Sequence, residues 1–161
     1  MTSRIAKLTI VVALFLCGTR AIAQDPRPYG PPVGVEDAKK AAAAALATAQ
    51  KNNWLMAVAV VDPSGTLVYY EKMDNTQTGS AQIAIDKART SALFKRPSKV
   101  FEDLVAGGGT GLRFLGLSGA MPIGGGIPLI SHNQFIGAIG VSGDSSDHDA
   151  ICAQAGANVI K

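Results

Sequence analysis

The clearest structural signal in this chain is a continuous apolar run that is followed at once by a strong turn. The run covers residues 54–61, contains several β-branched residues and is too short for a helix of usual length, so it predicts a strand covered on both faces. Residues 62–65, Asp-Pro-Ser-Gly, predict a turn, because proline presets its φ angle and glycine accepts positive φ. Residues 66–72 predict a second strand, which completes an antiparallel hairpin.

Helical and strand-like segments alternate along the rest of the chain. Residues 121–141 predict short strands, with turns at the glycines 124–126 and at residues 131–133. We expect helices at residues 35–52, 78–95 and 98–105, and a last one from Ser146 to Ile160 that opens with a Ser-x-x-acid capping box. These elements predict an α+β fold in which helices flank a central antiparallel sheet of about five strands.

The first 23 residues have the three-part pattern of a cleavable signal peptide. Arg4 and Lys7 form a positive n-region, residues 8–17 form an apolar stretch too short to span a bilayer, and residues 21–23 form an A-x-A cleavage site. We therefore expect a signal peptide at 1–23, a proline-rich extended linker at 24–34 and one domain at 35–161. This organisation predicts a periplasmic or secreted protein with no membrane span after cleavage.

Removal of the leader changes the charge balance and the cysteine count. Of 15 Lys and Arg residues, the leader holds Arg4, Lys7 and Arg20 and no acidic residue, so 12 basic residues remain against 12 acidic ones. A balanced charge gives no electrostatic footprint for nucleic acid. Cys152 is then the only cysteine, so no intrachain disulfide can form, and its apolar helical surroundings favour a buried structural thiol over an intermolecular bridge or a metal ligand.

The sequence has no motif of the common hydrolases or phosphate-binding loops. G-x-S-x-G and H-E-x-x-H are absent. We expect the glycine-rich residues 106–111 to form a flexible loop, and they are not followed by the Lys-Ser/Thr of a phosphate loop. On the helix at 78–95, four residues share the side opposite its alanine face, which favours packing or a subunit contact over catalysis. These four residues are Ile83, Lys87, Thr90 and Phe94.

Two other features have both a structural and a binding interpretation. The glycines 124–126 predict a hairpin turn, but they would also let the backbone approach a flat ligand closely. The helix N-terminus at Ser146 is explained by capping, although its free N–H groups could receive a carboxylate.

Four segments, taken in order, resemble the GlcG/HbpS-like haem-binding family. They are residues 57–65 (AVAVVDPSG), 84–92 (AIDKARTSA), 124–129 (GGGIPL) and 136–143 (IGAIGVSG), and the likeness covers about residues 35–160. The resemblance implies a profilin-like, three-layer α+β domain that assembles into homo-oligomers. It also implies a secreted haem-binding protein, with haem degradation or haem buffering as its role.

The resemblance further implies a set of site residues. Thr90, in a Lys-Ala-x-Thr motif, corresponds to the residue that is linked to the haem iron, and Lys87 and Arg89 are placed to pair with haem propionates. His132 and His148 are weaker alternatives as iron ligands. The remaining candidates by side-chain chemistry are Met73, Met121, Tyr69, Tyr70 and Cys152.

Two other functions stay open from the sequence. The first is an enzyme or binding protein for a small, glycolate-like organic acid, supported by the glycine loops, the helix N-terminus at Ser146 and the basic pair Lys87 and Arg89. The second is an accessory oligomer with no small ligand, in which the second side of the helix at 78–95 is only a subunit contact. The sequence does not decide whether the protein is an enzyme.

Overall fold

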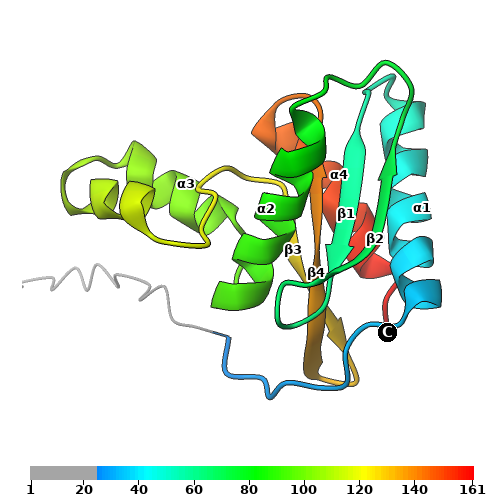
Figure 1. The fold of residues 1–161 in the computed structure, drawn as a ribbon, viewed down its shortest axis with the longest axis horizontal. Helices are drawn as coiled ribbons and strands as arrows, with labels where there is room; N and C mark the ends of the chain where they lie inside the picture. Colours follow the sequence, from blue (N-terminus) through cyan, green and yellow to red (C-terminus); the bar gives the residue numbers. More distant parts are fainter. Residues whose placement is uncertain (1–24) are drawn as a thin grey trace, which may run out of the picture.

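The computed structural model describes residues 25–161, which form an α+β fold around a four-stranded sheet (Figure 1). The strand order is β2-β1-β4-β3, and each neighbouring pair is antiparallel. The predicted α+β class is confirmed, while the predicted signal peptide lies outside the described residues. In chain order the elements are α1 (Val35–Lys51), β1 (Ala57–Val61), β2 (Leu67–Lys72), α2 (Ser80–Phe94), α3 (Lys99–Ala106), η1 (Gly109–Gly116), β3 (Gly126–Ser131), β4 (Gln134–Ser142) and α4 (Ser146–Asn158).

The hairpin predicted from the apolar run is confirmed by β1 and β2. Oδ1 of Asp62 accepts hydrogen bonds from the backbone N–H groups of Ser64 (2.8 Å) and Thr66 (2.9 Å), and Gly65 has a φ of +82°. All five residues of β1 are buried, because this strand lies between β2 and β4 and both of its faces are covered. The continuous apolar pattern of the sequence thus follows from a central position in the sheet.

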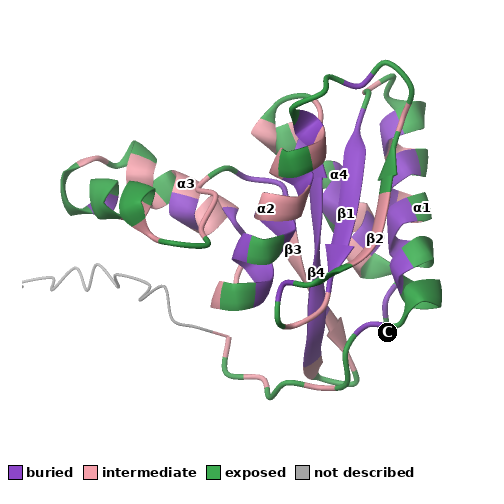
Figure 2. Ribbon diagram, viewed as in Figure 1, coloured by how far each residue is buried: buried purple, intermediate pink, exposed green. Residues whose placement is uncertain are grey.

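Helices cover both faces of the sheet. Val58 and Val60 share a core with residues of α1 and α4, whereas Ala57 and Ala59, which alternate with them, pack against α2. In β4, a Cβ atom added to Gly140 would overlap the backbone of α2, so the helix lies directly on the strand. Figure 2 shows the buried residues concentrated on the sheet and on the inner sides of these helices. The helix that carries the predicted site is therefore held rigidly.

The sheet has four strands, where about five were expected. Residues 121–123, the expected extra strand, run as a loop into β3, and Gly126 belongs to that strand rather than to a hairpin turn. Ser98 takes the place of a partner strand: its hydroxyl donates to the carbonyl oxygen of Ile123 (2.7 Å) and accepts from the N–H of Gly126 (2.8 Å). The start of α3 thus binds the backbone at both Ile123 and Gly126. The profilin-like description stays a prediction.

Helices α3 and η1 form an arm that projects away from the sheet (Figure 1). Residues 106–111 were expected to be a flexible glycine-rich loop, but η1 already begins at Gly109. The ring of Phe101 makes edge contacts with Phe94 of α2 and Phe114 of η1, at centroid distances of 5.2 and 5.5 Å. These aromatic contacts fix the base of the arm, which is why a segment rich in glycine still forms helical turns.

The proline-rich segment lies extended beside the first residues of β4. The N–H of Gly30 donates to the carbonyl oxygen of Phe135 (2.9 Å), and the N–H of Val33 donates to that of Ile136 (2.8 Å). The ammonium group of Lys95 lies 4.6 Å from the centre of the Tyr29 ring, a cation–π contact that ties this segment to the end of α2. Across residues 25–161, we find no helix with the length and apolar character needed to cross a membrane.

Candidate functional site

The three residues predicted for the site all lie on α2, but their side chains have different surroundings. Lys87 and Thr90 are buried, with exposed fractions of 1% and 0%, whereas the side chain of Arg89 is 46% exposed. Residues three apart on a helix share a side, and the residue between them is turned away. Arg89 is therefore the member of this set that meets solvent.

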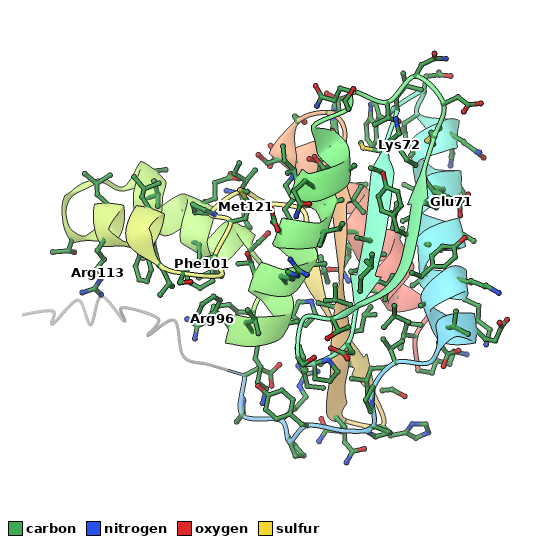
Figure 3. The ribbon with its side chains drawn as sticks, in the orientation of Figure 1. Glu71, Lys72, Arg96, Phe101, Arg113 and Met121 are labelled. Carbon is green, nitrogen blue, oxygen red and sulfur yellow. The ribbon has the colours of Figure 1, made fainter. Side chains whose placement is uncertain are left out.

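The hydroxyl group of Thr90 connects α2 to residues 117–125, which we call the returning loop because they lead from the arm back to β3. Its Oγ1 donates to the carbonyl oxygen of Asp86 (2.7 Å), one turn earlier, and accepts from the backbone N–H of Met121 (2.7 Å). The proton and one lone pair of the hydroxyl are thus used inside the protein. Figure 3 shows Met121 between α2 and the arm.

A pocket of about 270 Å³ lies between α2 and this returning loop. Its lining consists of Asp86, Arg89, Gly119, Ala120 and Met121. Nε of Arg89 donates to the carbonyl oxygen of Gly65 (3.0 Å), and its Nη1 lies 4.0 Å from Oδ1 of Asp86, so the guanidinium meets the pocket beside a carboxylate that also lines it. The pocket thus brings together a guanidinium, a carboxylate and Met121, whose backbone N–H is held by the hydroxyl of Thr90.

Lys87 does not reach this pocket, because its ammonium group binds a carboxylate inside the protein. Its Nζ lies 2.6 Å from Oδ2 of Asp149 in α4, and both side chains are almost fully buried. Burial raises the pKa of the Asp149 carboxyl above its ordinary value, although the ammonium of Lys87 and backbone N–H groups act in the opposite direction. The structure therefore gives Lys87 a partner other than the propionate that the resemblance implied.

Asp149 was expected to belong to a capping box, and the structure corrects that interpretation. The N-cap of α4 is Ser145, whose side chain accepts from the N–H of His148 (3.3 Å), rather than Ser146. The Asp149 carboxylate turns inward, where it also accepts from the N–H of Asp144 (3.2 Å). The sequence signal for Asp149 was its place in a Ser-x-x-acid pattern, and only the fold shows that Lys87 lies opposite.

The remaining part of the second side of α2 packs within the chain. Ile83 and Phe94 are half-buried, and Phe94 contacts Phe101 of α3. On this side of α2, Lys87 thus pairs with α4, Thr90 with the returning loop and Phe94 with the arm.

Glu102 of α3 binds the backbone of the glycine cluster, residues 124–126, which leads into β3. Its Oε2 accepts from the N–H of Gly124 (2.6 Å), and its other oxygen lies 3.1 Å from Nζ of Lys99. Burial tends to raise the pKa of this carboxyl, but the N–H of Gly124, Lys99 and the side chain of Ser146 outweigh it and leave the pKa below its ordinary value. Sequence reasoning missed Glu102 and Ser98, because neither belongs to a recognisable motif.

The two histidines lie outside the pocket lining. His132 is exposed in the turn between β3 and β4, with a φ of +48°. The His148 ring stacks on Trp54 at a centroid distance of 3.9 Å, and its Nδ1 lies 3.2 Å from a carboxylate oxygen of Asp144. His132 thus belongs to a turn, and the ring of His148 contacts Trp54 and Asp144 at the start of α4.

The expectation that Cys152 is a buried structural thiol agrees with the structure. Its side chain is fully buried, and burial, together with the nearby charge of Asp149, raises its pKa to about 11. In the part of the chain that is described, no group of three or more His, Cys, Asp or Glu side chains could hold a metal ion directly.

Comparison with known proteins defines the class to which this fold and pocket belong. Residues 33–158 match the family model described as "Haem degrading protein HbpS-like", so the chain belongs to the HbpS-like family. This confirms the resemblance seen in the sequence.

Individual relatives support the same assignment. Protein GlcG of Escherichia coli K12 is 40% identical over 100 residues, which cover 62% of this chain and 73% of GlcG. A double mutant of HbpS from Streptomyces reticuli has a similar fold, with a TM-score of 0.74, 26% identity and coverage of 97% of this chain and 99% of that chain. PduOC, whose structure is a complex with haem, has a TM-score of 0.72 and 27% identity, with coverage of 81% and 96%.

Proposed function

We propose that this chain is a secreted haem-binding protein that holds its ligand at the pocket between α2 and the returning loop. The observation that carries the proposal is the composition of that pocket: Arg89 and Met121 line it together, and Thr90 is hydrogen-bonded to Met121. The membership in the HbpS-like family and the fold shared with a haem complex of PduOC support haem as the ligand.

The chemistry of the pocket fits haem. The guanidinium of Arg89 suits a propionate, because it offers paired donors to a carboxylate. A thioether is a sulfur donor that binds haem iron in other proteins, and haem, once bound, would supply redox chemistry that the side chains lack. The volume of about 270 Å³ falls just below the roughly 300–1,000 Å³ of typical ligand pockets, so this chain alone would enclose part of a haem.

Several further properties belong to the same proposal. The leader at residues 1–23 supports export to the periplasm or the medium. We propose a homo-oligomer, because a second copy would cover the part of the ligand that one pocket leaves exposed. Haem buffering or haem degradation would be its role outside the cytoplasm.

Hemin titration tests this proposal. The chain is expressed with its leader and purified in the processed form, and the Soret band is followed as hemin is added. We expect saturation near one hemin per chain, and Arg89→Ala should weaken binding about tenfold, since a hydrogen bond to a charged group contributes about 1.5 kcal/mol. Arg113→Ala, at the far end of the arm (Figure 3), is the matched control and should bind like the wild type.

Two additional readouts extend the titration. Bleaching of bound hemin on addition of ascorbate in air, with release of iron, would support degradation, while an unchanged spectrum would support buffering. Light scattering with and without hemin measures the oligomeric state.

A small organic acid is the second candidate ligand, and the size of the pocket favours it. A space of about 270 Å³ lined by the guanidinium of Arg89 is the right size for a small carboxylate. If hemin adsorbs without saturation, thermal stabilisation by glycolate-like acids that Arg89→Ala abolishes would establish this alternative. If neither hemin nor the acids change the thermal stability, the remaining function is that of an accessory oligomer with no small ligand.

A further inference from the structure

The proline-rich segment before α1 occupies a surface that none of the functions above uses. We call residues 27–33 the strap, and we call the surface that receives them, which consists of Lys95 and residues 134–136, the groove. We propose that the groove is a binding site for the strap of a second copy of this chain, so that two copies join by exchanging their straps. This inference concerns contact between copies and does not depend on what the pocket binds.

The strap binds β4 as an added parallel strand. Tyr29 and Phe135 form a parallel bridge. The N–H of Gly30 donates to the carbonyl oxygen of Phe135 (2.9 Å), and the N–H of Phe135 donates to that of Pro28 (2.9 Å). This edge of β4 is open to the strap because β1 pairs with β4 only from Ala138 onward. Main-chain hydrogen bonds of this kind are the same whichever copy supplies the strap.

Lys95 carries the strongest sign that the groove is built to hold the strap. It follows the last residue of α2 with a φ of +48°, a conformation that costs a lysine more than a glycine. The residue is nevertheless only 4% exposed, and its ammonium donates to the carbonyl oxygen of Arg27 and faces the rings of Tyr29 (4.6 Å) and Phe135 (5.9 Å). Within residues 25–161 this ammonium forms no ion pair. The strap therefore supplies the carbonyl oxygen and the nearer ring that compensate a buried cation.

The groove is also selective for the sequence of the strap. A Cβ atom added to Gly30 would lie 2.8 Å from Cβ of Gln134 and 3.2 Å from Cγ2 of Ile136, so the close approach of the two strands requires glycine. At the other end, Val33 is buried, and its N–H donates to the carbonyl oxygen of Ile136 (2.8 Å). Three of the seven strap residues are proline, which keeps the strap extended before it binds. The partner that fits is thus a stiff, extended Tyr-Gly segment between prolines, which is what a second copy carries.

The connection to α1 lets the strap reach another copy. Gly34 has an extended backbone (φ −76°, ψ 159°), and an added Cβ would meet no atom within 4 Å, so the chain can change direction there without a clash. Figure 1 shows the strap on the outside of the fold, where it crosses one end of the sheet from α1 toward α2. Terminal segments of this kind open more readily than a core strand, because their hydrogen bonds lie near solvent. A strap that swings outward at Gly34 leaves its groove vacant, and the strap of a second copy restores the same contacts there.

Photo-crosslinking between isotopically distinct copies tests the exchange. Processed protein with p-benzoylphenylalanine in place of Tyr29 is prepared unlabelled and nitrogen-15-labelled, the two are mixed and irradiated, and mass spectrometry identifies the peptides that position 29 joins. We expect pairs between position 29 and the groove that combine one labelled and one unlabelled peptide, in a share that rises with protein concentration. Lys95→Met should lower the yield of these mixed pairs about tenfold, since it removes a desolvated cation–π contact. Gly30→Ala should lower the yield as well, whereas Gly34→Ala, whose added Cβ meets nothing, is the matched control and should leave it unchanged.

Three results would overturn the exchange. Pairs that never combine the two labels, at any concentration from micromolar to millimolar, would show that the strap binds only the groove of its own chain. Mixed pairs that map outside the groove, or that ignore both Lys95→Met and Gly30→Ala, would report a different interface between copies. Absence of any pair between position 29 and the groove would show that the strap does not bind there at all. Far-ultraviolet circular dichroism and thermal midpoints of all variants ensure that yields are compared between folded proteins.

Discussion

The ammonium nitrogen of Lys87 lies 2.6 Å from a carboxylate oxygen of Asp149, and this ion pair joins α2 on one face of the sheet to α4 on the other. The exposed fractions of the two side chains are 1% and 2%, so water does not solvate either charge. Each charge depends on the other for compensation, because an isolated buried charge is strongly unfavourable. The pair therefore has a structural role, because it links the helices on the two faces of the sheet.

Removal of one member of this ion pair should destabilise the protein strongly, whereas removal of both members should destabilise it far less. We expect Lys87→Met to lower the free energy of unfolding by about 3–5 kcal/mol, since it leaves the carboxylate of Asp149 buried without a partner. The double variant Lys87→Met, Asp149→Leu should recover most of that loss, because the desolvation cost disappears together with the attraction. Urea denaturation of the three proteins at neutral pH measures these differences.

The control for this comparison is an ion pair of the same chemistry on the surface. Lys39 and Glu36 of α1 form a pair at 3.1 Å with both side chains more than half exposed, so Lys39→Met should cost less than about 1 kcal/mol. A Lys87→Met variant that is no less stable than Lys39→Met would contradict the structural role assigned to the buried pair.

Glu102 should make the stability of the protein depend on pH in the acidic range. Its pKa in the folded protein is below the ordinary value of about 4.3, so its carboxylate stabilises the fold above that pH, and the contribution is lost as the pH falls through the folded pKa. Glu102→Gln removes the charge at every pH. We therefore expect the stability difference between wild type and Glu102→Gln to be largest near neutrality and to shrink below about pH 4.

Denaturation in urea at a series of pH values measures this difference, and subtraction of the two curves cancels the other carboxylates. Asp103→Asn is the matched control, because this neighbouring side chain is 63% exposed and its loss should leave the shape of the pH profile unchanged. A difference for Glu102→Gln that stays constant from neutral to acidic pH would show that its carboxylate gains nothing from the N–H of Gly124.

Cys152 should be chemically inert in the folded protein. With a pKa of about 11, roughly one thiol in a thousand is ionised at pH 8, and the side chain is also fully buried. We expect reaction with a thiol reagent to be slow in buffer and complete within minutes in urea, with or without hemin. Rapid modification of the native protein would mean that α4 opens readily, and Cys152→Ala shows whether any residual signal belongs to this thiol.

Much of the fold could be predicted because its elements are encoded locally. The hairpin of β1 and β2 follows from an apolar run and a turn motif, and α1 and α2 lie within two residues of their expected bounds. The extra strand at residues 121–123 was wrong because the backbone there bonds to side chains of distant residues rather than to a neighbouring strand: the N–H of Met121 donates to Thr90, and the carbonyl oxygen of Ile123 accepts from Ser98. The η1 helix was missed because aromatic contacts of Phe101 and Phe114, rather than local propensity, hold it in place.

The candidate site could be predicted from the sequence as a helix and a motif, but its contacts could not. The family motif drew attention to α2, and Arg89 of that helix lines a pocket. The partner of Lys87 is 62 residues away in sequence, and the loop that supplies Met121 follows an arm with no characteristic pattern. Contacts of this kind arise from tertiary packing, which composition and periodicity do not encode.

Replacement by alanine should have opposite effects on stability at two glycines of this chain. One is Gly125, before β3, and the other is Gly79, before α2. Gly125 has a φ of +116°, and an added Cβ would lie 2.7 Å from the carbonyl oxygen of Val141 and 2.8 Å from Cβ of Asp149. Gly125→Ala should therefore cost at least about 2 kcal/mol, from backbone strain and overpacking together. Gly79, before α2, has an ordinary φ of −63° and open space around its Cα, so Gly79→Ala should stabilise the protein by about 0.5 kcal/mol. Thermal unfolding of both variants measures the contrast, and two equal effects would show that Gly125 is not held against α4 as described.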